Sequence, residues 1–100
     1  MNKVIFSPEA VKDLEDIWLY IAQDSPDRAD NFVDKLRDSC MEDLALSPKI
    51  GSKRNYLSKD LLALPFKNYM IYYRCRSAQV QIVRVLHGSK DMGAIFNRSE

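Results

Sequence analysis

The sequence predicts an α+β fold, in which an N-terminal helical hairpin packs on a small twisted antiparallel sheet and a short C-terminal helix follows. Three observations predict it: two Ser-Pro helix starts in the first half, apolar residues at helical spacing after each, and two β-branched, aromatic runs in the second half. One hundred residues are expected to form a single domain, 1–100. The 46% hydrophobic and 29% charged residues are typical of soluble globular proteins. With no apolar run of membrane-spanning length and no secretory leader, we expect a cytoplasmic protein without a membrane partner.

The first half of the chain predicts a strand over residues 3–6 and two helices. Ser7-Pro8-Glu9 supplies a serine N-cap, a proline at the first helical position and a carboxylate in the first turn, and this helix is expected to end near Gln23. Ser25-Pro26-Asp27 repeats the signal, and Ser47-Pro48 ends the second helix because a residue before proline is kept out of the helical region. The expected apolar faces are Val11, Leu14, Ile17, Trp18 and Ile21 on the first helix, and Ala29, Phe32, Val33, Leu36, Cys40 and Leu44 on the second.

The second half predicts a loop and a small sheet. Residues 48–60 favour a loop, and residues 61–66 favour a strand that Pro65 confines to an edge or a terminal position. Two strong strands follow over 69–76 and 79–86, joined by a turn without glycine whose type the sequence leaves open. The tail 90–97 is expected to be a short helix anchored by Met92, Ile95 and Phe96.

A hairpin centred on residues 77 and 78 pairs positions whose numbers sum to about 155, which divides the side chains between two faces. The expected core face, lying on the helices, carries Tyr69, Ile71, Tyr73, Cys75, Val80, Ile82, Arg84 and Leu86. The opposite face carries Met70, Tyr72, Arg74, Arg76, Gln81, Val83, Val85 and His87. This second face is expected to expose its tyrosine, arginines, glutamine and histidine.

The charges divide between the two halves of the chain. Residues 1–48 carry five basic and eleven acidic side chains, whereas residues 49–100 carry ten basic and three acidic ones. The basic half suits RNA, DNA or an acidic protein segment, although the two halves can also neutralise each other within the fold. Arg84 interrupts an apolar face, so we predict that it forms a structural ion pair with Asp13 or Asp16 of the first helix.

Several polar residues are candidates for a functional site. Tyr72, Arg74, Arg76, Gln81 and Lys90 resemble a phosphate-binding sheet surface with a stacking ring, and equally a solvated sheet face. His87 has the intrinsic pKa of an acid-base group, but it lacks a nucleophile motif and fits a structural hydrogen-bonding role better.

Other residue types support no further chemistry. Gly88 is expected to adopt a backbone conformation that a Cβ would disfavour. Cys40 and Cys75 lack metal-ligand spacing and read as small buried hydrophobes, and the chain holds one histidine. No metal or cofactor is expected.

Short motifs spread over residues 3 to 96 resemble a known family. They are Ser7-Pro8-Glu9-Ala10 with Asp13-Leu14 and Ile17, Tyr20-Ile21-Ala22, Pro48-x-Ile50-Gly51 followed by Arg54, Asn68-Tyr69-x-Ile71-x-Tyr73-Arg74, and Arg84-Val85-Leu86-His87-Gly88. In this order and spacing the chain resembles the ParE branch of the RelE/ParE toxins of type II toxin-antitoxin systems. The resemblance implies the fold predicted above and a toxin that arrests growth.

The resemblance leaves two activities. RelE-like members cut mRNA on the ribosome, whereas ParE-like members poison DNA gyrase and so block replication. The positions at which the RNA-cutting members carry an early arginine, a basic residue and a late tyrosine correspond here to Pro65, Lys90 and Phe96. Only the basic charge is kept, so little remains to activate a 2′-hydroxyl. The sequence therefore favours a gyrase inhibitor that is not an enzyme, with a ribosome-dependent endonuclease as the alternative.

The resemblance also implies a cognate antitoxin and a hetero-oligomer with it. An acidic C-terminal antitoxin segment would wrap the toxin, bury apolar side chains and cover the basic sheet. The other half of the antitoxin would bind the operon, so this chain is expected to meet DNA only indirectly. A third possibility is an inactivated toxin kept to absorb antitoxin.

Overall fold

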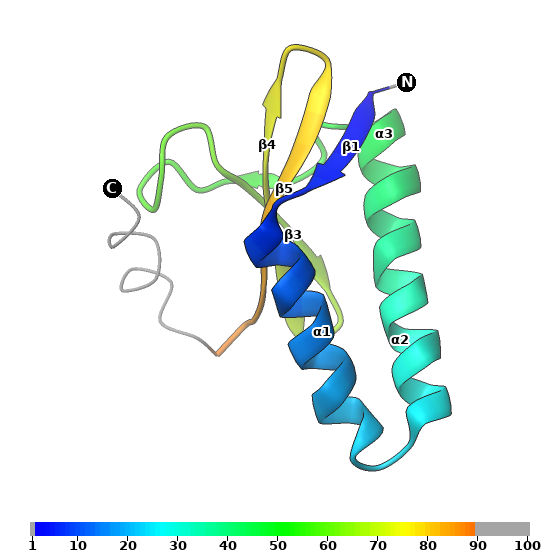
Figure 1. Cartoon of the computed structure of the whole chain (residues 1–100). Helices are drawn as coiled ribbons and strands as arrows, with labels where there is room; N and C mark the ends of the chain where they lie inside the picture. The colour runs from blue at the N-terminus through cyan, green and yellow to red at the C-terminus, as the bar shows by residue number, and fades with distance from the viewer. Residues whose placement is uncertain (1, 90–100) are drawn as a thin grey trace.

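Both predicted helix starts are present in the computed structural model, which describes residues 2–89. The hydroxyl of Ser7 accepts a hydrogen bond from the Ala10 amide at 3.0 Å and begins α1 (Pro8–Ala22). The hydroxyl of Ser25 accepts one from the Arg28 amide at 3.2 Å and begins α2 (Pro26–Asp38). The two helices lie side by side as a hairpin (Figure 1).

The second helical path ends where the sequence predicted, but it is not one regular helix. After α2, a π-helical segment η1 (Ser39–Asp43) carries the chain into α3 (Leu44–Leu46). The backbone leaves helical geometry at Ser47, directly before Pro48.

A five-stranded sheet packs against the helices. Its strands are β1 (Lys3–Phe6), β2 (Ser52–Lys53), β3 (Leu62–Phe66), β4 (Tyr69–Arg76) and β5 (Gln79–His87), in the spatial order β1-β5-β4-β3-β2. Because β1 pairs with β5 in parallel, the sheet is mixed, and the prediction of a purely antiparallel sheet is wrong. The helices and strands β2 to β4 all lie between these two strands in the chain, and a four-residue strand carries no signal in sequence for which strand it joins. In β3, Pro65 lies beyond the two residues that β2 pairs, where β3 forms the edge of the sheet.

The predicted register of the β4–β5 hairpin holds only near its turn. Tyr73 pairs with Ile82 and Arg76 with Gln79, as expected, but Tyr72 pairs with Arg84. The extra residue is Val83, which forms a β-bulge and moves Val85, Leu86 and His87 to the face opposite the predicted one, whereas Arg84 still reaches Asp13 of α1.

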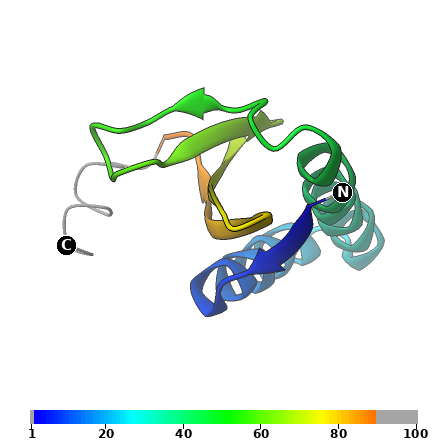
Figure 2. The same cartoon turned by 90° about the horizontal axis from the view of Figure 1, so that it is seen from above.

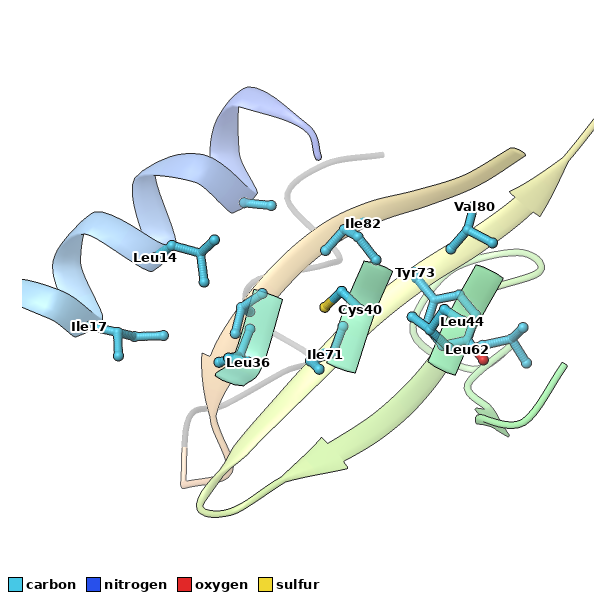
Figure 3. Close-up of a cluster of buried hydrophobic side chains, with 12 residues drawn as sticks. Leu14, Ile17, Leu36, Cys40, Leu44, Leu62, Ile71, Tyr73, Val80 and Ile82 are labelled. Carbon is cyan, nitrogen blue, oxygen red and sulfur yellow. The ribbon is translucent and has the colours of Figure 1, made fainter. Parts of the chain in front are cut away.

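The bulge changes which residues form the core. The main cluster lies between the sheet and the helices (Figure 3) and includes Ile71, Tyr73, Val80, Ile82 and Val85. Leu86, predicted for this face, instead joins a second cluster on the opposite face, with Leu57, Leu61, Ala63 and Tyr72. The prediction of an open second sheet face therefore holds only in part: residues 54–61 cover Tyr72, whereas Arg76 stays exposed as predicted.

Two further expectations concern the C-terminal segment and membrane-spanning helices. The helix predicted over 90–97 lies outside the described residues. Within residues 2–89, no helix combines the length and the apolarity that crossing a bilayer requires.

Candidate functional site

The predicted ion pair of Arg84 joins the sheet to α1. Arg84 Nε lies 2.8 Å from one carboxylate oxygen of Asp13 and Nη2 lies 3.0 Å from the other, a two-pronged arrangement. The Val85 amide donates a third hydrogen bond to Asp13, at 2.9 Å. Of the two predicted carboxylates, Asp13 is the one that pairs with Arg84. Asp16 instead pairs with Lys12 on the exposed side of the helix, at 3.3 Å.

The sheet face turned away from α1 and α2, here called the outer face, brings together three of the predicted site residues. Arg74 stands across the β4–β5 ladder from Gln81, and Arg76 stands across from Gln79. Arg74 is half-buried, and its guanidinium donates hydrogen bonds to the Lys59 carbonyl at 3.0 Å and to the Ser58 hydroxyl. Arg76, by contrast, is exposed near the hairpin tip.

Tyr72 occupies the same face but is covered. Its side chain is 3% exposed and packs in the second cluster, so the prediction that this tyrosine is exposed is wrong. Burial raises the pKa of its phenol, while the nearby Arg54 lowers it and Tyr56 raises it. A buried neutral phenol presents no ring face to a partner.

His87 lies apart from the arginines. The bulge places it opposite Tyr69, and the two rings meet edge to face with centroids 5.3 Å apart. Its Nδ1 is 2.7 Å from the Ser89 hydroxyl. The prediction that His87 shares a face with Tyr72 and Arg74 is therefore wrong. Lys90, the last predicted site residue, is outside the described part of the chain.

His87 lines an open groove of about 750 Å³ between α1 and the ends of β4 and β5. The apolar part of its lining consists of Ile17, Tyr20, Ile21, Phe32, Tyr69, Val85 and Leu86. Tyr20 is 69% exposed, so its ring stands at the surface of this groove. The Arg84–Asp13 pair lies at the same groove and gives it a fixed polar border.

The glycine that the fold needs is Gly51 and not Gly88. No glycine in residues 2–89 has a positive φ, and a Cβ on Gly88 would be 3.4 Å from the nearest backbone oxygen, so the conformational reason predicted for Gly88 is wrong. At Gly51 a Cβ would lie 2.6 Å from Tyr73 Oη, to which the Gly51 amide donates a 2.8 Å hydrogen bond.

Sequence reasoning missed two residues beside the outer face. Arg54 and Tyr56 belong to a segment read only as loop, yet Leu57 and Leu61 anchor that segment in the second cluster. The signal available was the spacing of those two leucines within a polar stretch, which marks a loop that packs back on the sheet.

The described residues offer little for acid-base or metal chemistry. Burial raises the pKa of the Tyr69 and Tyr73 phenols, and it raises the pKa of the Cys40 thiol to about 12. Within residues 2–89 no three side chains of His, Cys, Asp or Glu gather where they could hold a metal ion. The described residues present two distinct surfaces, an apolar groove and a basic outer face.

Comparisons with known proteins agree with this architecture. The family model described as "ParE toxin of type II toxin-antitoxin system, parDE" matches residues 4–92. A chain of the chromosomal ParDE toxin-antitoxin system from P. aeruginosa superposes with a TM-score of 0.74 at 19% identity, over 87% of this chain and 96% of that one. A chain of the toxin-antitoxin complex RelBE2 from Mycobacterium tuberculosis gives 0.64 at 22% identity, over 86% and 90%. No curated protein shows a significant match. At these identities the structural likeness concerns the fold.

Proposed function

Because this chain belongs to the ParE toxin family of type II toxin-antitoxin systems, we propose that it inhibits DNA gyrase and so blocks replication. The observation that carries the proposal is the family match over residues 4–92. Gyrase works on chromosomal DNA, so the place of action would be the cytoplasm.

The surroundings of the polar candidates support inhibition by binding over RNA cleavage. A ribonuclease needs a base near the 2′-hydroxyl and a cation for the transition state. Here Tyr72 is buried, and His87 lies on the other side of the sheet from Arg74, so neither group stands as a base beside that cation. The alternative, a ribosome-dependent mRNA endonuclease, is favoured only by the basic charge of the outer face.

A cognate antitoxin is the second part of the proposal. The two solved structures described above come from toxin-antitoxin systems, and the apolar groove beside Tyr20 suits the side chains of an antitoxin segment. The described residues from 49 onward carry eight basic side chains and one acidic one, Asp60, which suits an acidic antitoxin tail. The toxin would then form a hetero-oligomer, and the antitoxin would hold the operator DNA.

A direct experiment is to add the purified protein to gyrase, relaxed plasmid and ATP. Accumulation of linear or unsupercoiled plasmid supports the proposal, and prior addition of the cognate antitoxin should prevent it. If gyrase is unaffected while mRNA is cleaved on stalled ribosomes, the endonuclease is the function. If expression does not arrest growth although the purified protein still binds the antitoxin, the chain is an inactivated toxin.

A further inference from the structure

The outer face carries a strip of basic and aromatic side chains, of which the proposed function uses only the charge. The strip consists of Arg74 and Arg76, with Gln81 and Gln79 across the ladder from them, and of Arg54 and Tyr56, which lie near the Tyr72 phenol of the same face. Figure 2 shows the green segment that contains residues 54–61 on the far side of β4 and β5 from α1. The strip is therefore separate from the apolar groove.

The arginines of the strip are spaced and oriented for repeated anions. Arg74 and Arg76 are two positions apart on β4, so they lie on one face and their Cα atoms are about 6.5 Å apart. The two hydrogen bonds from the Arg74 guanidinium to residues 58 and 59 hold its plane in place before any partner arrives. A guanidinium fixed in this way loses little entropy when it binds a phosphate.

Tyr56 adds a rigid ring to these charges. It is 77% exposed, the most exposed of the large apolar side chains in the described residues. The backbone around it is tied down, because the Leu57 amide bonds the Arg54 carbonyl at 2.9 Å and Leu57 is itself 5% exposed. A ring held outward in this way is a stacking platform.

Negative charge is sparse around the strip. Asp60 is the one acidic residue among described residues 49–89, and the remaining described acids belong to residues 9–43 of the helical layer. The low overall charge of +1 thus hides a local excess of cations.

We propose that this strip binds a single-stranded nucleic acid, with phosphates on Arg54, Arg74 and Arg76 and one base stacked on Tyr56. An acidic peptide would satisfy the arginines but would leave the outward tyrosine ring unexplained, whereas a nucleic acid strand uses both. The inference goes beyond gyrase inhibition and does not depend on it. It also departs from the expectation that DNA is reached only through the antitoxin.

The test is fluorescence anisotropy with a labelled oligonucleotide of about 12 nucleotides, as DNA and as RNA, at several salt concentrations. Tyr56→Ala should weaken binding by about 5-fold to 150-fold, and Tyr56→Phe should keep most of it. Arg76→Gln should reduce the salt slope of the affinity by about 0.7. Arg28→Gln, a matched loss of charge on the exposed surface of α2, should change neither. These positions are exposed, so all four proteins are expected to fold.

Three results would overturn the inference. They are no binding at low salt, equal affinity for the corresponding duplex, and capture of polyglutamate without capture of the oligonucleotide. Comparing the DNA and the RNA oligonucleotide shows which kind of strand is bound more tightly, and binding of either one supports the proposal. The gyrase assay is read separately: inhibition without oligonucleotide binding removes this inference alone, and binding without inhibition removes the proposed function alone.

Discussion

Replacing Arg84 with alanine is expected to destabilise the protein by about 2 to 4 kcal/mol, because it removes the partner of a buried carboxylate. Asp13 is 7% exposed and lies 71 positions away in sequence, so the pair ties α1 directly to β5. No other described ion pair joins the helical layer to the sheet.

The magnitude follows from the contacts that are lost. Removing one member of a buried pair costs about 3 to 5 kcal/mol when the other stays buried without compensation. Here the Val85 amide still donates one hydrogen bond to Asp13. The Arg84 side chain is 28% exposed, so water can enter the space that it leaves. Both features reduce the expected loss from that range to about 2 to 4 kcal/mol.

Urea unfolding at neutral pH, followed by Trp18 fluorescence and far-ultraviolet circular dichroism, measures this loss. For a domain of this size the melting temperature should fall by about 10 to 30 °C. The matched control is Lys12→Ala, which removes an ion pair on the same helix with side chains 71% and 57% exposed. That change should stay within about 0.5 kcal/mol.

A loss of less than about 1 kcal/mol in Arg84→Ala, or one no larger than that of Lys12→Ala, would contradict this expectation. A double-mutant cycle with Asp13→Ala provides a second check. The two losses should be clearly less than additive if the side chains act on each other.

Three other changes test separate parts of the fold. Gly51→Ala should lower the free energy of unfolding by about 1 to 3 kcal/mol, since the new Cβ would lie 2.6 Å from Tyr73 Oη. Tyr73→Phe removes that oxygen, so the double variant should lose less stability than the two single variants added together. Ser77→Asn with Ala78→Gly should raise stability by about 1 kcal/mol, because φ values of 50° and 63° at the hairpin tip are those of a type I′ turn. Burial raises the pKa of Cys40 from 9.0 to about 12, so above pH 9 the folded protein keeps a proton that the unfolded chain loses. The free energy of unfolding should therefore fall by up to about 1.4 kcal/mol per pH unit above pH 9. Cys40→Ala should flatten that slope.

Each of these three expectations has its own contradiction. A Gly51→Ala protein as stable as the parent would mean that the turn has room for a methyl group. For the hairpin tip, Ala22→Gly at the end of α1 is the control, and it should lose about 0.5 to 1 kcal/mol. If Ala22→Gly also raises stability, the gain from glycine at the hairpin tip does not come from the positive φ values. A pH slope unchanged in Cys40→Ala would assign it to other groups.

Much of the fold was predictable because its signals are local. Ser7 and Ser25 cap their helices through hydrogen bonds that span three residues, and the strong strands 69–76 and 79–86 are evident from their own composition. The ion pair of Arg84 was also predictable, since a charge within an apolar run needs a partner and the first helix is acidic.

The candidate site was predicted less well, and one residue explains most of the difference. Val83 forms a bulge, which separates His87 from Arg74 and moves Leu86 to the outer face. A bulge depends on how β5 meets both β4 and α1, and a regular alternation of residues gives no sign of it. Covering of Tyr72 by residues 54–61 likewise depends on contacts between distant segments.

By itself the sequence determined where α1, α2 and four of the five strands lie, the resemblance to a toxin family, and the charged pair that links the two layers; β2, within the segment predicted as loop, was missed. Only the tertiary structure decided that β1 joins β5 in parallel, that the outer face is partly closed, and that Tyr56 rather than Tyr72 presents its ring. The physical reason is range. Caps, periodicity and strand composition act between near neighbours, whereas sheet order, register and burial are settled by packing between residues far apart in the chain.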